Sequence, residues 1–169
     1  MKRDKKVIDN VQALYGNPMS RSVKTSDWKR QHSGICQGCP LSPYLFVIMM
    51  NVLFADVRHR NNDTMHKTSL QHMNFQELLY TDDILIVAKK PQNARELIRY
   101  IEEESAYYNM KLNKDKCVCI TFNKNNKVTF ADRESINNVD ETIYLGLKLP
   151  KKSTLKPKLT GAFLRPCQR

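Results

Sequence analysis

The sequence predicts an α+β fold, and three observations support this prediction. Apolar residues recur at helical spacing in residues 7–15 and 94–108, and the almost wholly apolar run 44–54 is typical of a buried helix. Runs rich in Ile, Val, Leu and Tyr flank the Asp82-Asp83 pair, as in a β-hairpin. Further strands are predicted for residues 117–122, 128–130 and 142–147.

Composition and charge indicate a globular protein with a polyanionic partner. Of the 169 residues 41% are hydrophobic, and 28 Lys and Arg against 17 Asp and Glu give a net charge of +11. This excess indicates binding to a polyanion, most simply nucleic acid. No apolar run approaches the roughly 20 residues that a membrane span requires. Because no secretory signal follows Met1, we expect an intracellular protein of the nucleus or cytoplasm.

The charge is distributed unevenly along the chain. Residues 1–60 carry ten basic and four acidic residues, and residues 111–169 carry thirteen and five. Residues 61–110 carry five basic and eight acidic residues, and this acidic centre contains Asp82 and Asp83. A metal site that acts on a phosphate backbone would need this combination of an acidic centre and basic flanks.

The N-terminal third predicts a helix, a glycine-containing loop and a second helix. Gly16-Asn17-Pro18 would end the first helix. Gly34 and Gly38 either let the loop approach a ligand closely or serve only as a packing device. Ser42 and Pro43 suit the N-cap and first turn of the second helix, so we expect it to begin there.

The Asp82-Asp83 pair is the main candidate for a chemical site. Two adjacent carboxylates repel each other, so the pair is costly unless a cation or hydrogen-bond donors lie between them. Carboxylate oxygens suit Mg²⁺ or Mn²⁺, which take one or two protein carboxylates together with substrate phosphates. A solvated hairpin turn is the alternative, because Asp is a common turn residue.

The second half predicts an amphipathic helix, further strands and a basic tail. Asn93-Ala94-Arg95-Glu96 has the pattern of a capping box, and Asn109 can close this helix in the left-handed conformation. Residues 150–169 contain no acidic residue. We therefore predict a domain of residues 1–149 followed by a basic, loosely ordered arm of residues 150–169.

The five cysteines indicate a reducing compartment, because their number is odd and no secretory signal precedes them. Cys36 and Cys39 have the CxxC spacing of zinc sites, but Cys117 and Cys119 do not. We interpret Cys117 and Cys119 as buried residues of a strand.

Four motifs, in this order along the chain, resemble those of reverse transcriptases, which are RNA-directed DNA polymerases. The Gln37-Gly38-Cys39-Pro40-Leu41-Ser42-Pro43 loop is more similar to the non-LTR (LINE-type) retrotransposon branch than to the retroviral branch. The resemblance covers residues 7 to 149. The motifs are Gly34 to Pro43 with the helix after it, Tyr80-Thr81-Asp82-Asp83, the segment Asn113 to Lys116, and Tyr144-Leu145-Gly146.

The resemblance implies part of a polymerase palm, with an antiparallel sheet, helices on one face and a metal-binding Asp-Asp hairpin. Asp82 and Asp83 match the residues that hold Mg²⁺ (or Mn²⁺) for two-metal nucleotidyl transfer. Lys116 matches the residue that protonates or neutralises the leaving pyrophosphate. These three residues are the predicted catalytic residues.

The resemblance also implies substrate-binding residues and partners. Tyr80 matches the residue beneath the primer terminus, and Gln37 and Gly38 match the loop against the template and the incoming nucleotide. Tyr144-Leu145-Gly146 matches the primer-grip turn, which holds the primer strand. The implied partners are an RNA template, a DNA primer and deoxynucleoside triphosphates. We expect the Asp hairpin to lie within about 15 Å of the Gly38 loop, the reach of about five extended residues.

Departures from the family pattern predict that the isolated chain is inactive. In the family a further carboxylate lies on a strand upstream of the helix that we predict for residues 7–15, and this chain begins after that point. Cys36 stands where the family usually has Arg or Lys, and no helical thumb follows residue 150. We therefore expect a retrotransposon-derived fragment, with a non-catalytic nucleic-acid-binding relic or part of an intron-encoded maturase as alternatives.

Overall fold

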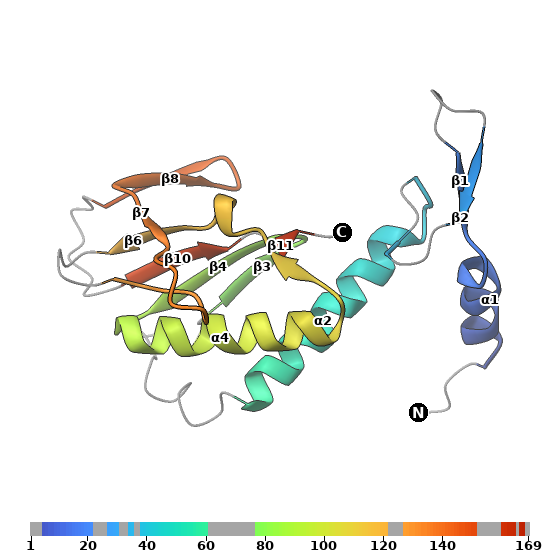
Figure 1. Cartoon of the computed structure of the whole chain (residues 1–169), viewed down its shortest axis with the longest axis horizontal. Coiled ribbons are helices and arrows are strands. Elements are labelled where there is room, and N and C mark those ends of the chain that lie inside the picture. The colour runs from blue at the N-terminus through green and yellow to red at the C-terminus, as the bar shows by residue number, and fades with distance from the viewer. Residues whose placement is uncertain are drawn as a thin grey trace. The chain divides into compact units, whose positions relative to one another are not determined.

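Two units make up the chain, one from Met1–Phe46 with Arg169 and one from Val47–Gln168 (Figure 1). Together they give a mixed α+β fold, as predicted. The computed structural model describes residues 5–21, 27–30, 34–35, 38–60, 77–121, 127–151, 160–164 and 166–167.

The first unit contains a helix and a short hairpin. Helix α1 (Lys5–Tyr15) confirms the helix predicted for residues 7–15, and it ends one residue before Gly16. A Cβ at Gly16 would lie 3.0 Å from the carbonyl oxygen of Gln12, so a larger residue would crowd the end of the helix. Strands β1 (Met19–Arg21) and β2 (Trp28–Arg30) pair antiparallel.

Helix α2 (Ser42–Arg60) begins at the predicted residue and runs beyond the predicted run 44–54. It buries one face in the core. The expectation that α2 is buried all round is wrong, because Tyr44 and Ile48 on another face are 69% and 59% exposed. An apolar composition alone therefore did not indicate which face would be covered. The buried residues of α2 are Ser42, Phe46, Met50, Leu53, Phe54 and Val57.

The second unit is built on a five-stranded sheet with the order β3-β4-β10-β6-β7. The first three pairings in this order are antiparallel, and β6 and β7 are parallel. Strand β10 lies within the region expected to be a basic arm, and it occupies the centre of the sheet. The strands are β3 (Glu77–Tyr80), β4 (Asp83–Ala88), β10 (Thr160–Leu164), β6 (Val118–Thr121) and β7 (Asn137–Asn138).

The two faces of β4 contact different layers. Ile84, Ile86 and Ala88 are at most 3% exposed and form one face of the strand, as the alternation of side chains requires. Leu85 lies on the other face, where it packs with Ile120. The predicted buried strand after the Asp pair is therefore present, and it forms the centre of the core.

Helix α4 (Pro91–Tyr107) lies along one side of the sheet (Figure 1). Its predicted apolar stripe is confirmed for the buried residues Ala94, Leu97, Ile98 and Ile101. The predicted capping box is wrong, because the helix already begins at Pro91, whose fixed φ suits a first helical turn. The predicted left-handed closure is confirmed by Asn109, whose φ is 59°.

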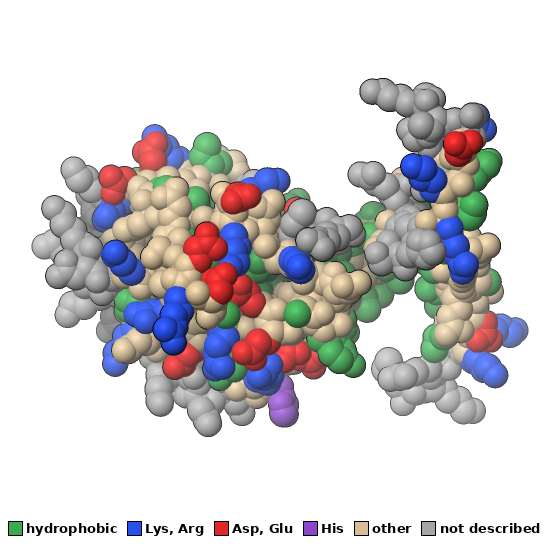
Figure 2. All heavy atoms as spheres, viewed as in Figure 1, with side chains coloured by type: hydrophobic (Ala, Val, Ile, Leu, Met, Phe, Trp, Pro, Cys, Tyr) green, Lys and Arg blue, Asp and Glu red, His purple; other side chains and the backbone are tan. Residues whose placement is uncertain are grey.

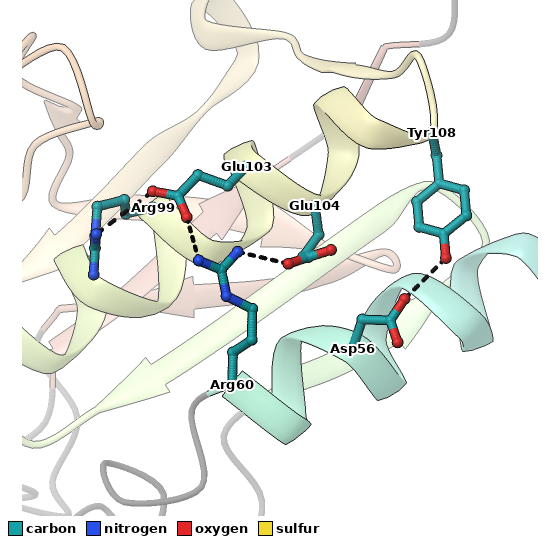
Figure 3. A network of polar contacts seen from close by, with 6 residues as sticks. All are labelled: Asp56, Arg60, Arg99, Glu103, Glu104 and Tyr108. Atoms are coloured by element: carbon teal, nitrogen blue, oxygen red, sulfur yellow. Dashed lines mark hydrogen bonds and ion pairs between the residues drawn. The ribbon is translucent and has the colours of Figure 1, made fainter.

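Polar contacts join α2 to α4 within the second unit (Figure 3). The guanidinium of Arg60 donates to Glu103 Oε2 at 2.8 Å and to Glu104 Oε1 at 2.6 Å. Further along, the hydroxyl of Tyr108 donates to Asp56 Oδ2 at 2.9 Å, and this bond raises the pKa of Tyr108. These contacts fix the register of the two helices beneath the sheet.

A hairpin of β8 (Glu141–Tyr144) and β9 (Leu147–Pro150) covers the other face of the sheet. Tyr144 and Leu149 pack there against the Leu85 and Ile120 cluster. The single strand predicted for residues 142–147 is wrong, because the chain reverses direction at Leu145-Gly146.

Short elements complete the second unit. Strand β5 (Lys111–Leu112) pairs antiparallel with β11 (Pro166–Cys167), and the 3₁₀-helix η1 (Lys114–Lys116) precedes β6. Cys117 and Cys119 are each 1% exposed, which confirms their interpretation as buried residues. Burial also raises the pKa of Cys119 to about 12, so this thiol stays protonated at neutral pH.

The packing of α4 predicts a large loss of stability on truncation of Ile98. We expect Ile98→Ala to lower the free energy of unfolding by about 2–5 kcal/mol, because Ile98 is wholly buried and its removal leaves a cavity. Urea denaturation followed by circular dichroism measures this. The matched control is Ile143→Ala, since Ile143 is 66% exposed and should lose less than about 1 kcal/mol. Equal losses in the two variants would contradict this packing.

Candidate functional site

A two-residue turn presents the Asp pair at the end of the β3–β4 hairpin. The register pairs Tyr80 with Asp83, so Thr81 and Asp82 form the turn and Asp83 begins the buried strand. Asp82 is exposed, and Asp83 is half-buried. Tyr80, which lies across from Asp83, is 58% exposed. The two carboxylates therefore lie at an accessible end of the sheet, next to the buried part of β4.

The turn contains an unusual backbone conformation. Thr81 has a φ of 49°, in the left-handed region that β-branched residues rarely occupy. Its hydroxyl Oγ1 donates to Asp82 Oδ1 at 2.9 Å. The side chain of Thr81 thus contacts a predicted metal ligand, a contact that the sequence analysis did not identify.

Tyr144 lies near Asp83 on one face of the sheet. Its hydroxyl donates to the carbonyl oxygen of Leu78 at 3.3 Å. Leu78 is paired with Leu85, two residues after Asp83 and on the same face of β4. Burial and the negative charge of Asp83 raise the pKa of Tyr144. Two residues predicted from separate motifs are therefore brought together in the second unit.

The predicted lysine lies at the same end of the sheet as the Asp pair. Phe163 of β10 is paired with Leu85 on one side and with Val118 on the other, so Leu85 and Val118 are level. Lys116 precedes Val118 by two residues, as Asp83 precedes Leu85. The backbones of β4 and β6 are two strand spacings apart, roughly 10 Å. Lys116, at the end of η1 just before β6, and Asp83 therefore lie at the same end of the sheet.

A second lysine of η1 has a structural role. Lys114 forms ion pairs with Asp132 and Glu134, and its ammonium lies 4.8 Å from the ring centre of Phe130. The hydrogen bond to Asp132 raises the pKa of Lys114. Lys116 in contrast is exposed, so it is the lysine of this segment that a ligand could reach.

The turn of the β8–β9 hairpin has positive φ at both central residues. Leu145 has a φ of 48° and Gly146 a φ of 79°. A two-residue hairpin with this backbone normally has Asn or Asp followed by Gly. Leu145 is 48% exposed, so burial gives little compensation for its unfavourable conformation. The predicted primer-grip residues therefore form a strained, exposed turn.

The predicted nucleotide-binding loop lies in the first unit. Gly38 has a φ of 87°, but a Cβ placed there would meet no atom within 4 Å. Backbone conformation rather than crowding therefore requires glycine at this position. Gln37, which the resemblance pairs with Gly38, lies outside the described residues. The expected closeness of this loop and the Asp hairpin stays a prediction.

A thiol and two hydroxyls meet after this loop. The hydroxyls of Tyr15 and Ser42 are 2.8 Å apart. The pKa of the Cys39 thiol is lowered, chiefly by the backbone N–H of Leu41 and also by the hydroxyl of Tyr15. These contacts anchor the end of α1 to the start of α2.

The strands beside β4 supply no further carboxylate on the face that carries Asp83. Strand β3 contains Glu77, which is opposite Ile86 and so lies on the helix-covered face. There it forms an ion pair with Arg58 at 2.8 Å. The sequence of β10, Thr160–Leu164, contains no acidic residue. Within the described residues no three acidic, histidine or cysteine side chains gather in a group that could hold a metal.

Comparison with known families decides the relationship. Residues 3–149 match the family described as reverse transcriptase (RNA-dependent DNA polymerase). The chain belongs to the reverse transcriptase family. The match spans the Gly38 loop, the Asp hairpin, η1 and the β8–β9 turn. No solved structure matches the chain. None of the described helices is both long and apolar enough to cross a membrane.

The strained turn at Leu145 predicts a stabilising substitution. We expect Leu145→Gly to raise the free energy of unfolding by about 1 kcal/mol, because glycine adopts a positive φ without steric cost. The matched control is Leu147→Gly in the adjacent strand, where glycine should lower stability by about 0.5–1 kcal/mol. Urea denaturation of both variants measures this. A loss of stability in both would show that Leu145 is not strained.

Proposed function

We propose that this chain is the palm portion of a reverse transcriptase from a non-LTR, LINE-type retrotransposon. The observation that carries the proposal is the Tyr80-Thr81-Asp82-Asp83 hairpin, which lies at an exposed edge of the sheet within the family match. In this proposal the hairpin binds the divalent cation used for nucleotidyl transfer. The substrates are an RNA template, a DNA primer and deoxynucleoside triphosphates.

The donor set of the hairpin fits one cation. Asp82 and Asp83 offer hard carboxylate oxygens at the exposed edge of the sheet, and Mg²⁺ or Mn²⁺ binds through one or two carboxylates plus water and phosphate oxygens. When bound, such ions lower the pKa of the primer hydroxyl and stabilise charge on the phosphoryl group. The carboxylates of Asp82 and Asp83 would hold the cation where the phosphates bind.

Residues at this end of the sheet also support the proposed substrate contacts. Lys116 would neutralise the pyrophosphate that leaves, since it is an exposed cation at the same end of the sheet as Asp83. Tyr80 would lie beneath the primer terminus, and Tyr144 would position the β8–β9 turn beside it. Independently of this end of the sheet, the resemblance assigns contacts with the template and the incoming nucleotide to Gln37 and Gly38 of the first unit.

The described strands on either side of β4 supply no third carboxylate for a second metal ion. Two-metal transfer needs a carboxylate on a strand beside the hairpin. Glu77 is directed to the opposite face and paired with Arg58, and the sequence of β10 has no acid. A complete site would therefore need a carboxylate from another segment.

This reasoning predicts that the 169-residue chain alone does not extend a primer. The described strands beside β4 offer no carboxylate for a second ion, and reactants that are not held across two ions lose positioning that can supply about 7–11 kcal/mol. Primer extension on an RNA template with Mg²⁺ or Mn²⁺ measures this, with Asp82→Ala as the control. Extension above that control would show that the 169-residue chain is sufficient for polymerase activity and would refute this prediction.

A second candidate function is nucleic-acid binding without catalysis, and the net charge of +11 favours it. Basic and acidic side chains are mixed on the face that carries α4, so the described side chains in this view form no continuous basic patch (Figure 2). Contacts to phosphate would then involve other surfaces, including the edge with Lys116. This function is compatible with the first, because a polymerase also binds its template.

Binding through phosphate contacts predicts a steep salt dependence. We expect the affinity for single-stranded RNA to fall as salt rises, and Lys116→Gln to reduce the slope of log K against log salt by about 0.7. Fluorescence anisotropy across a salt series measures the slope. The control is Lys90→Gln, because Lys90 follows the other end of β4 and should leave the slope unchanged. An affinity that does not change with salt would exclude phosphate-dominated binding.

A further inference from the structure

We propose that Thr81 is a positioning residue, whose hydroxyl holds the carboxylate of Asp82 in the orientation that binds a divalent cation. This inference rests on the proposed function, in which Asp82 is a metal ligand. It assigns a role to Thr81, which lies between Tyr80 and the Asp pair. Thr81 has no carboxylate and so would not itself bind the cation.

The first observation is the backbone of the turn. Thr81 occupies the first position of a two-residue hairpin turn with a φ of 49°. Turns of this length favour Gly, Asn or Asp at positions with positive φ. A β-branched residue is disfavoured there, because its two Cβ substituents crowd the backbone. Thr81 therefore occupies a backbone conformation that its side chain disfavours. Backbone strain of this kind is typical of functional positions.

The second observation is what the side chain of Thr81 does. Its Oγ1 donates to Asp82 Oδ1 at 2.9 Å. This bond engages one carboxylate oxygen and restricts rotation of the Asp82 side chain, so Oδ2 is the oxygen presented to a cation. Carboxylates that bind metals are commonly oriented by such hydrogen bonds.

Because Asp82 is exposed, restricting the rotation of its side chain should change the affinity for the cation. An exposed carboxylate otherwise samples several rotamers, and a cation that binds it must order the side chain. Ordering one side chain changes affinity by about two- to tenfold. The hydrogen bond from Thr81 already restricts the Asp82 side chain in the folded protein. Cation binding therefore loses less side-chain conformational entropy.

A purely structural role for Thr81 predicts a different pattern. If the side chain only stabilised the turn, cation affinity would follow stability across variants. Glycine separates the two roles, because Thr81→Gly relieves the backbone strain but removes the hydroxyl. We therefore expect Thr81→Gly to be at least as stable as the wild type and yet to bind the cation more weakly.

The test uses the full 169-residue chain and Mn²⁺ alone, with binding measured by electron paramagnetic resonance of free Mn²⁺. Thr81→Val keeps the shape without the hydroxyl, and Thr81→Ser keeps the hydroxyl. We expect Thr81→Val and Thr81→Gly to raise the Kd about two- to tenfold. Thr81→Ser should stay within about twofold of the wild type, and Asp82→Ala should remove the site. Thermal unfolding of each variant gives its stability.

The possible outcomes distinguish this inference from the proposed function. Equal Mn²⁺ affinity in the wild type, Thr81→Val and Thr81→Gly would overturn the role of Thr81 while leaving the metal hairpin in place. Equal affinity in the wild type and Asp82→Ala would overturn both. A second readout needs no metal, because Hα–Hβ couplings of Asp82 report its χ1 rotamer. We expect one rotamer in the wild type and Thr81→Ser, and averaging in Thr81→Val; averaging in all three would also overturn the inference.

Discussion

The burial of β4 is the constraint on which the rest of the second unit depends. Ile84, Ile86 and Ala88 must all lie in the core, and a strand alternates its side chains between two faces. A shift of one residue would bring the neighbouring Asp83 to the helix-covered face, where a buried carboxylate is costly. The packing of β4 therefore fixes Asp83 on the face that also carries Leu85 and Tyr144.

Elements that depend on local pattern could be predicted from the sequence. The apolar spacing of α1 and α4 and the Ser42-Pro43 start of α2 are determined by nearby residues. The resemblance implied a turn at Tyr144-Leu145-Gly146, but the residue pattern did not indicate the reversal, because Leu is an unusual residue for a turn with positive φ. The place of β10 could not be predicted, since its pairing with β4 and β6 depends on residues far away in the sequence.

In the candidate site, too, residue types could be predicted from local motifs, whereas their arrangement depends on residues far apart in the sequence. Motifs identified Asp82, Asp83 and Lys116 by residue type. Only the register of β4, β10 and β6 shows that these residues lie at the same end of the sheet. The closeness of Tyr144 to Asp83 likewise depends on how the β8–β9 hairpin packs on the sheet. The signal for Thr81 was present in the sequence, as a β-branched residue in a two-residue turn, but its bond to Asp82 required the structure.

Two of the described residues with an unfavourable backbone conformation lie at or near the Asp pair, as expected of a functional site. Among the non-glycine residues described with positive φ, Asn109 is of a type that tolerates this conformation, whereas Thr81, Arg133 and Leu145 are not. Arg133 lies in the turn between Phe130 and Glu134. Thr81 adjoins Asp82, and Leu145 follows Tyr144, whose pKa is raised in part by Asp83. Sequences that fold well avoid such conflicts except where function requires them. Thr81 and Leu145 thus adjoin Asp82 and Tyr144, and a binding role for the hairpin accounts for the strain at these two positions.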